Sequence, residues 1–209
     1  KRTLAYRFST FVVRQWARLW LRFETHGVEN VPAEGACLIA ANHVSYLDPP
    51  LVAVSCRHRT VRFMARSTLF RTAIGNWYFR SVGVVPLDRD RGDVGAMRTI
   101  LRLLAEGGVV GLFPEGTRSH DGQLKEAKRG IGFLIVKAGV PVVPVHIDGT
   151  YRACPRGARW PRPCKARLTY GEVIGVDELT AMGKGKAAYE EASRVVMERI
   201  SRLQVAKEA

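Results

Sequence analysis

The strongest constraint on the fold is an alternation, after Gly27, of short apolar runs with segments of helical periodicity. Short apolar runs fit strands buried in a sheet, and helices between them allow successive strands to run parallel. The pattern therefore predicts a single α/β domain with a mostly parallel central sheet flanked by helices. The expected strands are Cys37 to Ala41, Val61 to Ala65, Val82 to Leu87, Val109 to Phe113, Val142 to Ile147 and Ala166 to Tyr170.

Three further helices are expected along this domain. One spans Gly92 to Glu106 and ends at the Gly107-Gly108 pair, because paired glycines after an apolar helical face are typical of a helix end. Another lies between Lys128 and Gly139, and a last one of about 20 residues closes the chain. The Arg- and Pro-rich stretch from Arg152 to Arg162 is expected to be an exposed basic loop.

The first 23 residues predict an amphipathic helix whose polar strip carries Arg7, Arg14 and Arg18. Its apolar positions are Leu4, Phe8, Phe11, Val12, Trp16, Leu19, Trp20 and Phe23. Docking on the domain core would use only about half of so wide a face, and aromatics beside Arg suit the headgroup boundary of a bilayer. We therefore divide the chain into a membrane-associating helix (1–24) and a domain (25–209) that includes the C-terminal helix.

The net charge limits the classes of partner. Thirty-three Lys and Arg residues against 19 Asp and Glu give +14, which attracts phosphates on nucleic acid, on an anionic bilayer or on coenzyme A. A basic nucleic-acid-binding module is the alternative of a different class. However, neither an aromatic and basic strand pattern nor a known binding motif is found, so no nucleic acid is expected as partner. Phosphoryl transfer is disfavoured because the chain has no GxxxxGK[ST] loop.

The cysteines and the hydropathy indicate a reduced compartment. The four cysteines form no CxxC pair and have no His partners at zinc-finger spacing, which predicts free thiols and no metal site. No apolar run approaches the roughly 18 to 20 residues that cross a bilayer, and no signal-peptide pattern is found. A protein facing the cytosol is therefore expected.

The first candidate site is Asn42-His-Val-Ser-Tyr-Leu-Asp-Pro-Pro50, directly after an expected strand. Ligand sites of open α/β sheets gather at the carboxyl ends of strands. The two prolines suit the first turn of a helix with Asp48 as N-cap. A turn through residues 44–47 could then bring Asp48 to His43, fix the imidazole tautomer and leave the second ring nitrogen to take a proton from a hydroxyl. Alternatively, Asp48 only caps its helix.

The second candidate site, Phe113-Pro-Glu-Gly-Thr-Arg-Ser119, follows another strand at the same expected edge of the sheet. Gly116 allows close approach of a ligand, Thr117 and Ser119 offer hydroxyls, and Arg118 presents a planar fork of donors suited to a phosphate. Glu115 is expected to orient Arg118 or a backbone turn. The alternative is an ordinary loop with an exposed salt bridge.

Two more cations could join an anion site. Arg89 closes the third expected strand, and Lys128 lies where a helix begins. Both could equally lie on a solvated basic surface.

The order and spacing of four blocks resemble the glycerolipid acyltransferases, which include the 1-acylglycerol-3-phosphate acyltransferases. The blocks are Asn42 to Asp48, Gly83 to Arg89, Phe113 to Ser119 and Val143 to Val145. The resemblance covers roughly residues 25 to 180. In Phe63-Met-Ala-Arg66, many members of that family carry Lys where this chain has Arg66, which keeps the charge but not the geometry.

The resemblance implies His43 as general base, Asp48 as its orienting partner, and Arg89, Glu115, Gly116 and Arg118 as the site for the acceptor's phosphate. Thr117, Arg66 and Lys128 complete the expected substrate-binding set. The implied reaction moves a fatty acyl group from acyl-coenzyme A or acyl-carrier protein to lysophosphatidic acid, without metal, cofactor or covalent enzyme intermediate. Other acceptors that fit are glycerol 3-phosphate and another lysolipid such as lyso-ornithine lipid. The expected location is the cytoplasmic face of the cell membrane, bound to anionic phospholipid.

Overall fold

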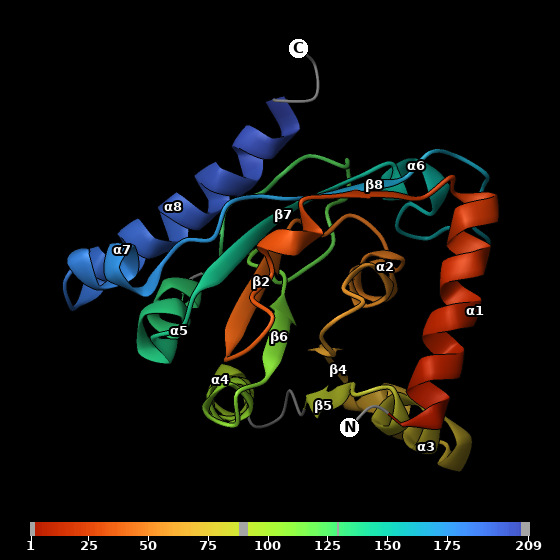
Figure 1. The fold of residues 1–209 in the computed structure, drawn as a ribbon, viewed down its shortest axis with the longest axis horizontal. Coiled ribbons are helices and arrows are strands. Elements are labelled where there is room, and N and C mark those ends of the chain that lie inside the picture. The colour runs from red at the N-terminus through yellow and green to blue at the C-terminus, as the bar shows by residue number, and fades with distance from the viewer. Residues whose placement is uncertain (1–2, 88–91, 129, 206–209) are drawn as a thin grey trace.

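The computed structural model describes residues 3–87, 92–128 and 130–205 (Figure 1). Its helices of six residues or more are α1 (Leu4–Trp20), α2 (Asp48–Ser55), α3 (Ala73–Ser81), α4 (Gly92–Ala105), α5 (Ile131–Ala138), α7 (Val176–Ala181) and α8 (Lys186–Val205). Shorter turns of helix are η1 (Val28–Asn30), η2 (Ser67–Phe70) and α6 (Thr150–Ala153). The strands are β1 (Glu24–His26), β2 (Cys37–Ala41), β3 (Val61–Arg62), β4 (Met64–Arg66), β5 (Val85–Leu87), β6 (Val109–Leu112), β7 (Val142–Asp148) and β8 (Arg167–Tyr170).

The central sheet has the strand order β1-β8-β7-β2-β6-β3. Every neighbouring pair is parallel except β7 and β8, which run antiparallel. The predicted α/β domain with a mostly parallel sheet is therefore confirmed. Because β2 lies between β6 and β7, the carboxyl ends of β2 and β6 emerge side by side.

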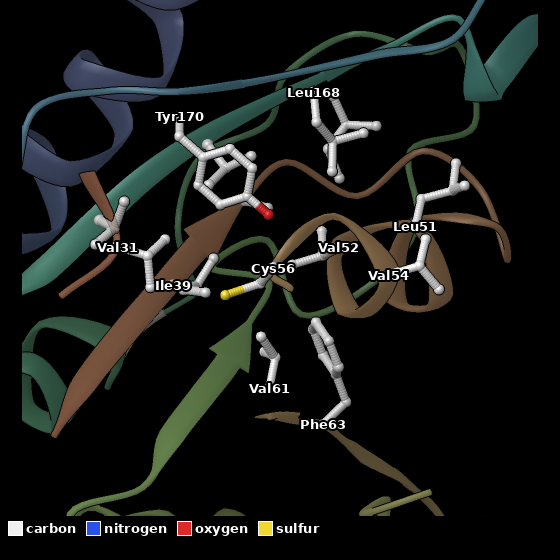
Figure 2. Packing of buried hydrophobic residues seen from close by; sticks show 14 of the residues in the cluster. Val31, Ile39, Leu51, Val52, Val54, Cys56, Val61, Phe63, Leu168 and Tyr170 are labelled. Atoms are coloured by element: carbon white, nitrogen blue, oxygen red, sulfur yellow. The ribbon is translucent and has the colours of Figure 1, made fainter. Parts of the chain in front are cut away.

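Helices cover both faces of this sheet, which explains why β2 is an uninterrupted apolar run. Cys37, Ile39 and Ala41 face the layer of α1 and α2, whereas Leu38 and Ala40 face the layer of α4, α5 and α8. Figure 2 shows the first layer, where side chains of α2 meet those of the sheet. The sheet is thus a rigid support for whatever extends from its carboxyl edge.

Two expected strands are corrected. The run from Val61 to Ala65 is not one strand: it divides at Phe63 into β3 of the main sheet and β4, which pairs with β5 in a separate two-stranded sheet. The run from Val82 to Leu87 is shortened to β5, because α3 continues to Ser81 and Gly83 turns the chain with a positive φ of 81°. Helix α3 and strand β1 were not predicted.

The N-terminal helix was expected over residues 1 to 23 and spans Leu4–Trp20. It docks through a narrow side: Tyr6 and Ala17, with Leu21 just beyond its end, are buried. The Arg14 guanidinium donates to the carbonyl of Val54 at the end of α2. Its outward side carries large exposed apolar residues, namely Leu4, Phe8, Phe11, Val12, Leu19 and Trp20. Most of the wide apolar face therefore does not pack on the domain.

Within the described residues, no helix combines the length and the hydropathy needed to span a bilayer. The basic stretch from Arg152 to Arg162 begins as the last turn of α6 and then continues as a loop. Arg156, Arg159, Trp160 and Arg162 of this loop are exposed. The predicted exposed basic loop is therefore confirmed beyond its first residues.

Candidate active site

His43 and Asp48 are in direct contact beyond the carboxyl end of β2. His43 Nδ1 lies 2.8 Å from Asp48 Oδ2, and the Asp48 carboxylate is completely buried. The same oxygen accepts the backbone N–H groups of Val44 at 2.7 Å and Ser45 at 2.8 Å. The turn through residues 44–47 therefore brings the pair together, as predicted.

Asp48 differs from its expected role as an N-cap. It is the first residue of α2, Leu47 occupies the cap position, and the prolines follow in the first turn. Asp48 turns its carboxylate back toward the preceding loop, where two N–H groups and the imidazole converge on one oxygen. Capping is thus not an alternative explanation for Asp48; the residue organises the loop that carries His43.

This contact sets the tautomer of His43. A carboxylate can only accept, so Nδ1 carries the proton of the Nδ1–Oδ2 hydrogen bond and Nε2 holds a lone pair. The His43 side chain is 17% exposed, and no described residue is hydrogen-bonded to Nε2. The geometry therefore leaves one basic nitrogen able to take a proton from an incoming hydroxyl.

The loop of residues 113–119 holds the backbone of His43 from both sides. Glu115 Oε1 accepts the His43 N–H at 2.9 Å, and the Ser119 N–H donates to the His43 carbonyl at 2.8 Å. This follows from the register of the sheet, in which Ala40 of β2 pairs with Leu112 of β6. The two sequence blocks therefore form one structural unit.

Glu115 was expected to orient either Arg118 or a backbone turn, and the structure shows its buried carboxyl in the second role. It orients the backbone at His43 rather than Arg118, and only 4% of the residue is exposed. Burial raises the pKa of Glu115 to about 7, although the His43 N–H and the charge of Lys125 oppose the shift. A group in this position acts on the site through His43 and does not face outward toward a ligand.

A stack of aromatic rings supports the imidazole. The rings of His43 and Phe113 lie 4.0 Å apart between centroids and 16° from parallel, and Phe63 stacks behind Phe113 at 5.6 Å. Gly111 of β6 leaves room for the last ring, because a Cβ at this position would come within 2.2 Å of Phe63 Cε1. The orientation of His43 therefore depends on a glycine in the middle of a strand.

Arg118 lies over the exposed ring of Tyr46, with its guanidinium carbon 3.4 Å from the ring centroid. Its Nη1 is buried and has no hydrogen-bond partner among the described residues. This cation–π contact fixes the guanidinium beside the loop of His43. A planar cation with an unused donor is suited to binding a phosphate or carboxylate.

Gly116, Thr117 and Lys128 lie on the outer side of the same loop, and all three are exposed. Gly116 adopts a positive φ of 66°. The Lys128 side chain crosses it so closely that a Cβ would come within 2.4 Å of Lys128 Cδ. Lys128 also donates its backbone N–H to the Pro114 carbonyl at 2.8 Å. The structure thus brings the Lys128 side chain to the loop that bears Arg118.

Ser119, whose hydroxyl was considered available to a ligand, is completely buried and donates to Asp121 Oδ1 at 2.6 Å. Of the two remaining cations, Arg66 ends β4, and its backbone pairs with Leu87 of β5. Arg89 lies outside the described residues. Among the residues that the structure does describe, no three His, Cys, Asp or Glu side chains form a potential metal site.

Two residues with a part in this site were not assigned one from the sequence. Tyr46 holds Arg118, and Asn42 joins the end of β2 to β7 by accepting the Ile147 N–H at 2.7 Å and donating to its carbonyl at 3.0 Å. A buried amide side chain directly after a strand needs hydrogen-bond partners, so Asn42 could have been predicted to bond to a neighbouring strand. An exposed Tyr three residues after His43 and two before Asp48 gives no such signal.

A loop at the carboxyl edge of an α/β sheet that bears a His and Asp pair beside an arginine is suited to group transfer from or to a hydroxyl near an anion. A sequence model of the family described as acyltransferase matches residues 22–148, and the chain belongs to this family.

Named relatives are 1-acyl-sn-glycerol-3-phosphate acyltransferases. The enzyme of that name from Pseudomonas aeruginosa is 30% identical over 200 residues, which cover 88% of this chain and 73% of the relative. The chloroplastic BAT2 of Brassica napus is 32% identical over 159 residues, which cover 73% of this chain but only 46% of the relative. The chain thus spans about half the length of its plant relatives.

A solved structure shares the fold. The crystal structure of the 1-acyl-sn-glycerophosphate acyltransferase PlsC from Thermotoga maritima superposes with a TM-score of 0.78 at 30% identity. The match covers 96% of this chain and 80% of that one. The similarity of fold therefore extends over nearly the whole chain.

Proposed function

We propose that this protein transfers a fatty acyl group from an acyl thioester to the free hydroxyl of lysophosphatidic acid, which gives phosphatidic acid. The observation that carries the proposal is the hydrogen bond between His43 Nδ1 and Asp48 Oδ2, on a loop held by the segment that bears Arg118. The relatives named for 1-acyl-sn-glycerol-3-phosphate supply the acceptor.

The chemistry follows from the state of the imidazole. His43 Nε2 takes the proton of the acceptor hydroxyl while the oxygen attacks the thioester carbon, and the buried Asp48 carboxylate stabilises the imidazolium that forms. Collapse of the tetrahedral intermediate expels the thiolate, which receives the proton. General base catalysis contributes about 10²- to 10⁴-fold, and orientation of the two substrates contributes much of the rest.

Recognition of the acceptor falls to the cations near this loop. Arg118 carries a half-buried guanidinium whose Nη1 has no hydrogen-bond partner among the described residues, and the Lys128 side chain lies against Gly116. Both cations match the phosphate of lysophosphatidic acid. The sequence adds Arg66 and Arg89 as further candidates. The thioester is already activated, so we propose a reaction that needs neither metal nor cofactor.

We also propose that the protein works at the cytoplasmic face of the cell membrane. Its acceptor and its product are lipids, and the outward side of α1 exposes Leu4, Phe8, Phe11 and Leu19. Apolar side chains next to exposed arginines suit the boundary of an anionic bilayer. Helix α1 would then lie along the surface rather than cross it.

The experiment that tests the reaction is an acceptor panel with palmitoyl-coenzyme A and palmitoyl-carrier protein as donors. Release of free thiol is followed with lysophosphatidic acid, glycerol 3-phosphate, lyso-ornithine lipid or no acceptor. We expect release to depend on lysophosphatidic acid and to be lost in His43→Ala, whereas His26→Ala, which changes an exposed imidazole in β1, leaves it unchanged.

Three results would contradict the proposal. Thiol release without any acceptor would indicate a thioesterase. Preference for another acceptor would keep the chemistry but change the substrate. Tight binding of nucleic acid without any thiol release would favour the basic binding module instead.

A further inference from the structure

Two exposed tryptophans lie next to the two ends of α1, on segments far apart in the sequence. Trp77 is on α3 and is 65% exposed, and Trp160 is in the loop after α6 and is 82% exposed. Figure 1 shows α1, α3 and the loop after α6 along one side of the molecule. Large aromatic side chains so exposed indicate a surface that normally meets a partner.

Each of these segments is joined to α1 by a hydrogen bond. At the start of the helix, Thr3 Oγ1 donates to the Ser81 carbonyl at 2.8 Å, one turn of α3 beyond Trp77. At the end of α1, Trp20 Nε1 donates to the carbonyl of Pro161 at 3.2 Å, and Pro161 directly follows Trp160 in the sequence. Both tryptophan-bearing segments are therefore fixed to α1.

The exposed apolar surface continues on α3 and the turn before it. Ile74, Trp77 and Tyr78 follow the spacing of one helix face, and all three are exposed, as is Leu69 of η2. The opposite side of α3 faces inward through Phe79, whose ring contacts Phe70. Helix α3 thus has a packed side and an unpartnered apolar side, like α1.

The charge of the three segments is one-sided. Residues 3–23, 67–81 and 154–165 contain ten Lys and Arg and none of the 19 Asp and Glu of the chain. In contrast, Arg194 of α8 forms ion pairs with Glu191 and Glu198. Lys165 pairs with Glu24 at 2.7 Å, just outside these segments. An excess of cations around exposed apolar side chains is complementary to an anionic lipid surface and unlike the mixed charge of a solvated face.

We propose that the protein contacts the bilayer at three places: the outer side of α1, the η2–α3 segment through Trp77, and the loop after α6 through Trp160. Tryptophan favours the headgroup level, where its ring is in an apolar layer and its N–H reaches polar groups. Helix α1 is about 25 Å long at 1.5 Å per residue. One aromatic anchor at each end would hold it parallel to the surface.

This inference rests on the membrane part of the proposed function and extends it to two segments outside α1. It is tested by sedimentation with vesicles of phosphatidylcholine and phosphatidylglycerol in equal parts. The variants are Trp77→Ser, Trp160→Ser, their conservative counterparts Trp77→Phe and Trp160→Phe, and the α1 variant Phe8→Ser/Phe11→Ser. Val173→Ser serves as the control, because it removes an exposed apolar side chain outside the three segments.

We expect each Trp→Ser change to weaken partitioning about tenfold, as loss of a largely inserted aromatic side chain implies. The Phe and Val173→Ser variants should bind like the parent. Brominated lipid should quench parental emission, and the quenched fraction should fall in Trp77→Phe and Trp160→Phe. Activity on substrate dispersed in detergent should not change, since neither residue touches the candidate site.

Two results would overturn the inference alone. If Phe8→Ser/Phe11→Ser loses binding while both Trp→Ser variants keep it, α1 is the only contact. If the parent is a dimer without vesicles and the Trp→Ser variants are monomers, the surface belongs to a second copy of the chain. Failure of the parent itself to bind vesicles would instead refute the membrane part of the proposed function.

Discussion

The guanidinium carbon of Arg118 lies 3.4 Å from the centre of the Tyr46 ring. This contact joins the loop of His43 to the loop of Arg118 on their outer side, while Glu115 and Ser119 join them underneath through the backbone of His43. His43, the proposed base, and Arg118, the proposed phosphate-binding residue, are thus held in one structural unit. A substitution in either loop should therefore alter the position of residues in the other.

Replacement of Tyr46 should impair acceptor binding without touching the base. We predict that Tyr46→Leu raises the KM for lysophosphatidic acid roughly two- to fivefold with little change in kcat, because an exposed cation–π contact contributes about 0.5 to 1 kcal/mol. Tyr46→Phe keeps the ring and should match the parent. Steady-state kinetics distinguish these cases, and equal effects of Leu and Phe would mean that the ring does not position Arg118.

Removal of the guanidinium should affect the acceptor selectively. We predict that Arg118→Ala raises the KM for lysophosphatidic acid about 10- to 100-fold, the equivalent of a charge-assisted hydrogen bond, and changes the KM of the acyl donor much less. A monoacylglycerol, which lacks the phosphate, should be used equally by both proteins. If the two KM values rise together, Arg118 does not belong to the acceptor site.

Loss of the Asp48 carboxylate should cost stability as well as activity. We predict that Asp48→Ala lowers the free energy of unfolding by about 1 to 3 kcal/mol for each backbone N–H left without an acceptor. His43→Ala should abolish transfer but unfold near the parental midpoint, because the imidazole is at the edge of the core. Denaturant titrations of both variants measure the difference. Equal stability of the two would show that the Val44 and Ser45 N–H groups find other acceptors.

Glu115 should make stability depend on pH in an unusual direction. Its pKa is raised from 4.5 to about 7 on folding, so the folded protein holds a proton that the unfolded chain has lost between these pH values. Stability should therefore fall as pH rises through this window, by at most about 1.4 kcal/mol per pH unit. In Glu115→Gln, which keeps an acceptor for the His43 N–H, this component should vanish. Thermal unfolding at several pH values compares the two proteins, and parallel curves would refute the assignment.

Gly111 should influence catalysis without touching a substrate. We predict that Gly111→Ala displaces Phe63 and through Phe113 tilts His43, since its Cβ would come within 2.2 Å of the Phe63 ring. Overpacking of this kind costs about 1 to 3 kcal/mol, and kcat should fall. Gly111→Ala/Phe63→Leu should recover both stability and kcat. Gly175→Ala, which meets nothing within 4 Å, is the control, and failure of the double variant to recover kcat would contradict the ring-stack mechanism.

The buried strands were predictable because their apolar runs are long and uninterrupted. Strands β2 and β6 match their expected ranges to within one residue. Strand β1 was missed because Glu24-Thr25-His26 contains no apolar residue, and its place in the sheet depends on pairing with β8. Where the run from Val61 to Ala65 divides, the Phe63 ring packs against Gly111 of β6, which is far away in the sequence. Local patterns carry no information on such contacts.

The site was predictable where local chain geometry decides it. Pro49 and Pro50 fix the start of α2, which places Asp48 at the end of a short turn from His43. The role of Glu115 was not predictable in the same way, because its partner is the backbone of His43, 72 residues away in the sequence. The sequence likewise offers no reason to pair Tyr46 with Arg118.

The pairing of β1 with β8 has a consequence for the order of folding. The edge of the sheet forms only when Glu24 meets Arg167, which lies 143 residues later in the chain. During synthesis, β1 therefore cannot pair with β8 until most of the chain has left the ribosome. Contacts between residues so far apart in the sequence also form slowly. We expect α1, which precedes β1, to be exposed throughout this interval. On the proposal that α1 binds a bilayer, a lipid surface would capture this helix before the sheet is complete, and the protein would reach the membrane while it is still folding.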